Sequence, residues 1–254
     1  MFPIFNLGPL ALPTYPLLLL VALWSGMAVS ARQASRLGLD GDHVYNAGLY
    51  GLIAGIIGAR LWFVLSHWEN YSSNLSQALS LSRSALSAGE GLIIAGLVIL
   101  IYLQLAKVPL GQIFDALAPG LTVAIIIANV GAFLAGESLG SPTQVSWAVA
   151  SANVPRHPFQ LYQAIAGVGI LLALYLLRRR RPWPGFQFWL FVSLYSGLRL
   201  FFEIFRDQPP IIGDGFLAVQ LLALSAIVIS LAVMASKFRS TPMKIEVETH
   251  EFVG

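Results

Sequence analysis

The segment 216–236 reads FLAVQLLALSAIVISLAVMAS and contains no charged residue. A helix needs roughly 20 mostly apolar residues to cross the hydrocarbon core of a bilayer, so this segment is long enough for a transmembrane helix. Other apolar runs of similar length recur along the chain. The predicted spans are Tyr15–Ser30, Tyr45–Leu65, Gly89–Lys107, Ile113–Ala135, Phe159–Leu177, Phe186–Phe205 and Phe216–Ser236. The sequence therefore predicts an all-α integral membrane protein, a bundle of about seven transmembrane helices.

The composition agrees with a chain that folds in lipid. Hydrophobic residues make up 57% and charged residues only 11%, with a mean hydropathy of +0.74, whereas soluble domains carry roughly 25% charged residues. The apolar runs leave no stretch for a separate soluble domain, so residues 1–254 are expected to form one polytopic membrane domain, with 238–254 as a short cytoplasmic tail. The first 13 residues contain no Lys or Arg, so we expect no cleaved signal peptide. There is no cysteine, which excludes disulfides and thiolate-bound metals.

The basic residues predict how the bundle is oriented. If the seven spans alternate, ten of the 15 basic residues fall on one side: Arg32, Arg36, Lys107, Arg178, Arg179, Arg180, Arg181, Lys237, Arg239 and Lys244. Lys and Arg in short loops remain on the cytoplasmic side, so the N-terminus is expected outside the cytoplasm and the C-terminus inside. The run 178–181 could instead bind anionic lipid head groups. Because these residues lie at the edges of apolar runs, no nucleic-acid partner is expected.

The sixth predicted span carries a stripe of polar and ionisable residues. Tyr195, Arg199, Glu203 and Arg206 are spaced by four, four and three residues, which places them within roughly an 80° arc of an α-helix. A charge at the centre of a bilayer costs about 2.5 to 3.5 kcal/mol, so such residues usually face a protein interior or a cavity. The stripe predicts a functional site that opens at the outer face. The alternative is an ion ladder that only fixes how the helices pack.

Other ionisable residues are candidates for the same site. Arg60 lies in the second span, and Glu137 follows the fourth span between glycines that permit a sharp turn. Glu137 could pair with Arg60 or Arg199. Arg156 and His157 lead into the fifth span between two prolines, where they could supply donors for a phosphate or a base near neutral pH. The alternative is an anchor at the membrane interface.

The motifs that indicate nucleotide or metal chemistry are absent from the sequence. There is no phosphate-binding loop of the Gly-x-x-x-x-Gly-Lys type, no His-Glu-x-x-His pair and no Gly-x-Ser-x-Gly elbow. The four histidines are scattered through predicted loops and the tail. We therefore predict no metal site.

Four segments carry a resemblance to a known family. They are Gly58-Ala59-Arg60-Leu61, Gly136-Glu137-Ser138-Leu139-Gly140, Pro155-Arg156-His157-Pro158-Phe159-Gln160-Leu161-Tyr162 and Leu198-Arg199-Leu200-Phe201-Phe202-Glu203-Ile204-Phe205-Arg206. Together with Tyr15 near the start of the first span, they make the chain resemble the bacterial prolipoprotein diacylglyceryl transferases. These are multi-pass proteins of the inner, or plasma, membrane with seven helices.

The resemblance implies a reaction and a set of site residues. The family moves the diacylglyceryl group of phosphatidylglycerol to the thiol of a lipobox cysteine in a preprolipoprotein, and no cofactor is expected. By this resemblance Arg199 holds the lipid phosphate, Glu203 and Tyr195 orient it, Arg206 guards the outer opening and Glu137 shapes the catalytic loop. The same likeness makes Tyr15, Arg60, Arg156 and His157 candidates for substrate binding.

The chain departs from the family pattern at three positions. Where the family has a histidine before the third span, this chain reads Ala88-Gly89-Glu90-Gly91, so Glu90 becomes the candidate base. Asn129 and Ala132 stand where the family carries an arginine and an asparagine. These replacements support an alternative: a catalytically inactive relative that serves as a lipid-binding or accessory subunit alongside other membrane subunits.

Overall fold

The computed structural model describes residues 2–8, 10–71, 87–137, 140–151, 154–207, 211–212 and 216–240. Within them, six helices are long and apolar enough to cross a membrane: α1 (Thr14–Arg36), α2 (Asp42–Ser66), α5 (Leu110–Ala135), α6 (Phe159–Leu176), α7 (Phe186–Phe202) with its 3-10 extension η3 (Glu203–Phe205), and α8 (Ala218–Ser240). The seventh predicted span is helix α4 (Ala88–Leu105), which is apolar but shorter. A single turn, α3 (Trp68–Tyr71), follows α2. The predicted all-α membrane bundle is thus confirmed.

Several helix ends differ from the predicted spans. Helix α1 continues to Arg36 and α8 to Ser240, because helices extend past the apolar part of a span into its basic flank. Residues 238–240 of the predicted tail are therefore helical. The remainder of that tail, 241–254, lies outside the described residues.

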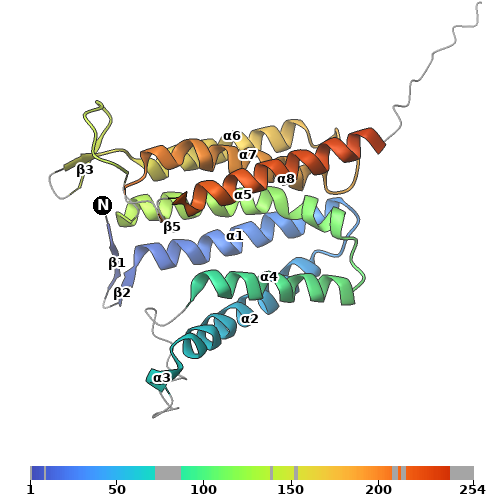
Figure 1. The fold of residues 1–254 in the computed structure, drawn as a ribbon, viewed down its shortest axis with the longest axis horizontal. Coiled ribbons are helices and arrows are strands. Elements are labelled where there is room, and N and C mark those ends of the chain that lie inside the picture. Colours follow the sequence, from blue (N-terminus) through green and yellow to red (C-terminus); the bar gives the residue numbers. More distant parts are fainter. Residues whose placement is uncertain are drawn as a thin grey trace, which may run out of the picture.

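Three short antiparallel hairpins gather at one end of the bundle (Figure 1), which we call the hairpin end. They are formed by β1 (Ile4–Leu7) with β2 (Leu10–Pro13), β3 (Val149–Ser151) with β4 (Val154–Arg156), and β5 (Ile211–Ile212) with β6 (Phe216–Leu217). Hydropathy did not predict them. Phe216 and Leu217, expected to open the last span, form β6 and precede α8.

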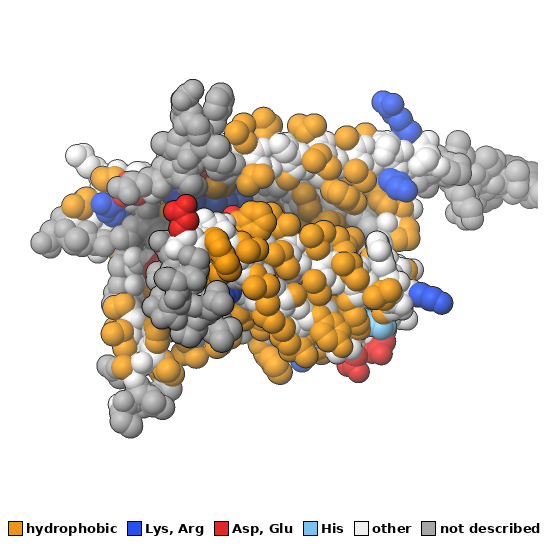
Figure 2. Space-filling view, turned by 60° about the horizontal axis from the view of Figure 1, so that its bottom comes forward, with side chains coloured by type: hydrophobic (Ala, Val, Ile, Leu, Met, Phe, Trp, Pro, Cys, Tyr) orange, Lys and Arg blue, Asp and Glu red, His pale blue; other side chains and the backbone are white. Residues whose placement is uncertain are grey.

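The opposite end carries the turns α1–α2, α4–α5 and α6–α7 and the last residue of α8, and we call it the arginine end. All the described residues of the predicted cytoplasmic basic set lie in or next to these turns and the end of α8. Lys and Arg side chains project from this end in Figure 2. The segregation of charge agrees with the alternating topology, while the assignment of this end to the cytoplasm stays a prediction.

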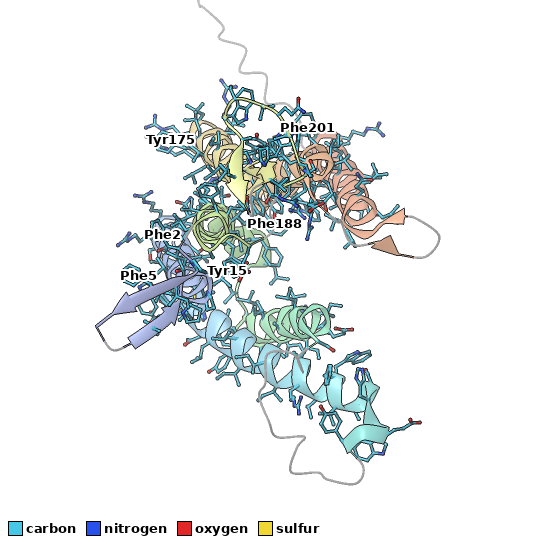
Figure 3. All side chains as sticks on the ribbon, turned by 90° about the vertical axis from the view of Figure 1, so that its left-hand side faces the viewer. Phe2, Phe5, Tyr15, Tyr175, Phe188 and Phe201 are labelled. Atoms are coloured by element: carbon cyan, nitrogen blue, oxygen red, sulfur yellow. The ribbon has the colours of Figure 1, made fainter. Side chains whose placement is uncertain are left out.

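Helix pairs with small residues at their crossings build the bundle. Helices α1 and α5 approach so closely that a Cβ on Gly26 would lie 2.9 Å from the carbonyl oxygen of Gly120, as is common between membrane helices. Helices α2 and α4 form a second pair that stands apart from the others at the hairpin end (Figures 1 and 3). At the arginine end the two pairs meet in a buried cluster that includes Ala34, Val44 and Leu103. The bundle is therefore closed at one end and opens toward the other.

Candidate functional site

Three of the four sequence motifs meet at the hairpin end through backbone hydrogen bonds. The amide of Gly140 donates to the carbonyl of His157 (3.2 Å), and the amide of Ser141 donates to the carbonyl of Phe205 (2.8 Å). Gly140 also forms a bridge with Arg206. A Cβ on Gly140 would lie 2.8 Å from both the carbonyl oxygen of Phe205 and the Cβ of His157, so only glycine fits between these segments.

The turn after α5 has the geometry that its glycines predicted. Gly136 adopts the left-handed conformation at φ +76°, and the amide of Glu137 donates to the carbonyl of Ala132 (2.9 Å), which ends the helix. The carbonyl of Glu137 accepts a hydrogen bond from the side-chain amide of Gln160 on α6. Glu137 therefore ties the loop to α6 through its backbone.

An ion cluster joins the end of α7 to the residues that follow it. Nη2 of Arg199 lies 3.2 Å from Oε2 of Glu203, and Nη1 of Arg206 donates to Oε1 of the same carboxylate at 3.1 Å. The side chain of Glu203 is fully buried, while those of Arg199 and Arg206 are 20% and 26% exposed. Two guanidinium groups thus share one carboxylate, which leaves one positive charge uncompensated within the cluster.

The prediction that the polar stripe lies on one continuous α-helix is wrong for its last residue, Arg206. The α-helix ends at Phe202, Glu203 begins η3, and Arg206 is extended with φ −84° and ψ 137°. The bridge to Gly140 explains this change, because a residue that pairs with another segment cannot continue the helical hydrogen-bond pattern. Arg206 still reaches Glu203, but from the loop rather than from the helix.

A cavity of about 360 Å³ lies beside this ion cluster. Its walls come from α1, α5, α6 and α7 and include Tyr15, Tyr195, Arg199 and Arg206. Figure 3 looks along the bundle from the hairpin end and shows Tyr15 on the side of α1 that faces the space between the helix pairs. In Figure 2 the surface is hollowed between two hydrophobic lobes, and Lys or Arg side chains lie in the hollow near the hairpin end.

Two glutamines in the cavity wall were missed as site residues by the sequence reasoning. Gln160 and Gln163 lie on α6, and both line the cavity. Oε1 of Gln160 and Nε2 of Gln163 are buried without a hydrogen-bond partner. An unpartnered buried polar atom is costly, so these groups indicate a place where a ligand supplies the partner. Two amides three residues apart in an apolar span were the available signal.

Other predicted site residues do not line this cavity. Arg156 donates to Asp207 (2.6 Å) and to the carbonyl of Gly140 (3.2 Å), so it braces the loop. Nδ1 of His157 lies 3.1 Å from the hydroxyl of Tyr162.

The second helix pair holds the remaining candidates. Arg60 is only 6% exposed on α2, where its guanidinium lies 5.2 Å from the ring centre of Tyr71. Glu90 lies in the first turn of α4, at the hairpin end. Their roles in binding and catalysis stay predictions.

The two positions replaced in α5 face the cavity. Asn129 and Ala132 both line it. The side-chain amide of Asn129 donates to the carbonyl of Ile125 in its own helix (2.8 Å). The arginine that the resemblance implies at the first of these positions is therefore absent, and Arg199 and Arg206 are the cations of the cavity wall.

Comparison with known proteins agrees with this geometry. Residues 3–236 match the family described as prolipoprotein diacylglyceryl transferase. Proteins named phosphatidylglycerol–prolipoprotein diacylglyceryl transferase are 28% identical in Clostridioides difficile (82% of this chain, 84% of the relative), 26% in Finegoldia magna (91% and 92%) and 30% in Acaryochloris marina (83% and 81%). The match extends over nearly the whole chain, including every motif around the cavity. This chain belongs to the prolipoprotein diacylglyceryl transferase family.

Proposed function

We propose that this protein transfers the diacylglyceryl group of phosphatidylglycerol to the cysteine thiol of a preprolipoprotein. The cavity beside Arg199, Glu203 and Arg206 is the observation that carries the proposal. It combines an excess positive charge with unpartnered amide groups, as an anionic head group requires. As a multi-pass protein of the bacterial plasma membrane, the chain meets this lipid in the bilayer itself.

The reaction replaces a carbon–oxygen bond of the lipid with a carbon–sulfur bond to the cysteine. The thiol sulfur bonds to the terminal glyceryl carbon, the bond from that carbon to the phosphate oxygen breaks, and the electron pair leaves with glycerol phosphate. Arg199 and Arg206 hold the phosphate and stabilise the charge that develops on it, because guanidinium groups bind phosphate through charge-assisted hydrogen bonds. Glu203 fixes both guanidinium groups in place.

The thiol must lose its proton to a base. We assign this role to Glu90, which stands one position after the family's histidine and begins α4 at the hairpin end. Tyr15 and Tyr195 contribute hydroxyl groups to the cavity wall from α1 and α7, and we assign them to orienting the head group. Glu137 keeps the loop in place above the cavity through its backbone.

The test uses the purified full-length chain, labelled phosphatidylglycerol and a lipobox peptide. We expect label on the cysteine and release of glycerol phosphate, with both abolished or strongly reduced in Arg199→Gln. A matched control is Arg180→Gln, which removes the same charge at the arginine end and is expected to leave the rate unchanged.

The alternative of an inactive relative gives a different result in the same assay. It predicts that the chain binds phosphatidylglycerol but transfers nothing, and that it fails to rescue a strain depleted of its own transferase. Retained binding without transfer would reject the proposed reaction in favour of an accessory role.

A further inference from the structure

A second cavity system lies at the arginine end, far from the candidate site. One cavity of about 330 Å³ and another of about 600 Å³ lie between α1 and α6, and Arg36, Tyr175 and Arg178 line both. Because the two cavities are adjacent and share these wall residues, we treat them together as the arginine groove. It extends from the bundle interior to the α6–α7 turn.

Cations dominate the lining of the arginine groove. Arg32, Arg36, Arg178, Arg179 and Arg181 contribute to its walls, and none of its lining residues is an Asp or a Glu. Among the described residues, the ion pairs of the chain involve none of these five arginines. Arg181 interacts electrostatically with the buried carboxylate of Asp115, whereas the other four arginines have no described acidic partner. Such an excess of positive charge around a cavity favours an anionic ligand.

Apolar residues line the inner part of the same groove. Val29 precedes Arg32 on α1 and Leu171 precedes Arg178 along the chain, and both line this cavity together with Pro119 of α5. On α6 the neighbouring side chains of Leu172 and Leu176 are 56% and 66% exposed, as expected for a surface that faces lipid. A charged mouth above an apolar wall matches an amphiphile with an anionic head, rather than a small soluble anion.

Buried hydrogen bonds fix the mouth of the groove. Nη2 of Arg181 donates to Oε1 of Gln187 (3.3 Å), and Gln187, which is 2% exposed, donates in turn to the carbonyl of Leu174 (3.2 Å). Nε of Arg181 is buried and has no partner. The guanidinium of Arg178 lies 3.7 Å from the ring centre of Tyr175. Arg181 is therefore held in a fixed position at the mouth of the groove.

We infer that the arginine groove binds the head group of a second anionic phospholipid, in the leaflet opposite the candidate site. The rule that keeps basic residues in the cytoplasm does not explain the groove by itself. Arg180 and Arg239 satisfy the same rule at the same end, yet neither lines either cavity. What separates the groove arginines from these two is the cavity that they surround.

The test counts lipids on the full-length protein. Nondenaturing mass spectrometry of the detergent-solubilised chain, titrated with phosphatidylglycerol, resolves the first and second bound lipid. The groove variant Arg36→Gln/Arg178→Gln removes two phosphate contacts and is expected to weaken one binding event about thirtyfold. The control Arg180→Gln/Arg239→Gln removes the same charge from the same end, and we expect a change of less than about twofold on this scale.

Further arms identify the ligand and separate the two sites. Arg199→Gln should weaken the other binding event and leave the groove event intact. Phosphatidylcholine should not replace phosphatidylglycerol, and millimolar inorganic phosphate should not displace it. Equal losses in the groove and control variants would overturn the inference, as would equal retention of phosphatidylcholine or displacement by phosphate alone.

Discussion

The two ends of the bundle use arginine in opposite ways. At the hairpin end, Arg199 and Arg206 are half-buried and share the fully buried carboxylate of Glu203. At the arginine end, Arg178 and Arg179 are exposed and take part in no described ion pair, while a buried carboxylate serves the backbone instead. That carboxylate is Asp115, whose two oxygens accept hydrogen bonds from the amides of Gly185 (2.8 Å) and Phe188 (3.1 Å).

The comparison teaches what an acidic residue does in each place. Glu203 positions two cations beside a cavity, so its carboxylate serves the site. Asp115 caps the start of α7 from another helix, so its carboxylate stabilises the fold. Removing each should affect different measurements, and the predictions below run from the largest expected effect to the smallest.

The first prediction concerns Glu203. Glu203→Gln removes the fully buried carboxylate that two half-buried guanidinium groups share, which should lower the free energy of unfolding by about 3 kcal/mol, the low end for breaking a buried ion pair. Thermal unfolding in detergent measures this loss. The double variant Glu203→Gln/Arg206→Gln also removes one of the two arginines left without a counter-charge, so it should be more stable than Glu203→Gln alone. If single and double variants unfold at the same temperature, the cluster is not coupled in this way.

The second prediction concerns Arg199, one of the two arginines that share the carboxylate of Glu203. Arg199→Gln should lower kcat/KM by about two to three orders of magnitude, because it removes a charged donor that stabilises the leaving phosphate. Arg199→Lys keeps the charge but loses the planar fork, so an intermediate rate is expected. Steady-state transfer from labelled phosphatidylglycerol measures both. A rate in Arg199→Gln equal to that of the unaltered chain would assign Arg199 to packing alone.

The third prediction tests the other end. Asp115→Ala leaves the amides of Gly185 and Phe188 without an acceptor, and should cost about 1 to 2 kcal/mol of stability. Because α7 holds its site residues at the far end, the transfer rate per folded molecule should remain close to that of the unaltered chain. Asp115→Asn retains one acceptor oxygen and should cost less. A large loss of rate at unchanged stability would contradict the assignment of Asp115 to the fold.

The fourth prediction concerns the unpartnered amide in the cavity wall. Gln163→Met removes a buried donor that has no partner within the described part of the protein, so stability should stay level or rise. If a lipid oxygen is its partner, KM for phosphatidylglycerol should rise about fivefold, equivalent to roughly 1 kcal/mol. Gln104→Met on the exposed face of α4 is the matched control. A fall in stability without a change in KM would mean that Gln163 only fills space.

The sequence predicted most of the bundle because each span is a local pattern. An uncharged run of about 20 residues has few ways to satisfy its backbone in lipid, so helix and length follow from hydropathy. The spacing of Arg199 and Glu203 likewise follows from one turn of a helix. These features need no knowledge of the neighbours of each residue.

What escaped prediction depends on contacts between distant segments. Asp115 caps a helix that begins some 70 residues later in the chain, and the end of α7 at Phe202 follows from the pairing of Arg206 with Gly140. Gln163 becomes a wall residue only when α6 packs against α5 and α7. Arg156 was predicted to donate hydrogen bonds to a phosphate. Its ion pair with Asp207 joins two distant segments of the chain, so the local sequence does not indicate it.

The separation of α2 and α4 from the other helices at the hairpin end affects how a lipid enters the site and how a product leaves it. A hollow on the flank of the bundle lets a lipid arrive by two-dimensional diffusion, without extracting its acyl tails into water. The same flank offers an exit to a product that has just gained two such tails. Encounter frequency is then governed by the surface density of the lipid in its leaflet and by the fluidity of the bilayer, rather than by any concentration in the aqueous phase.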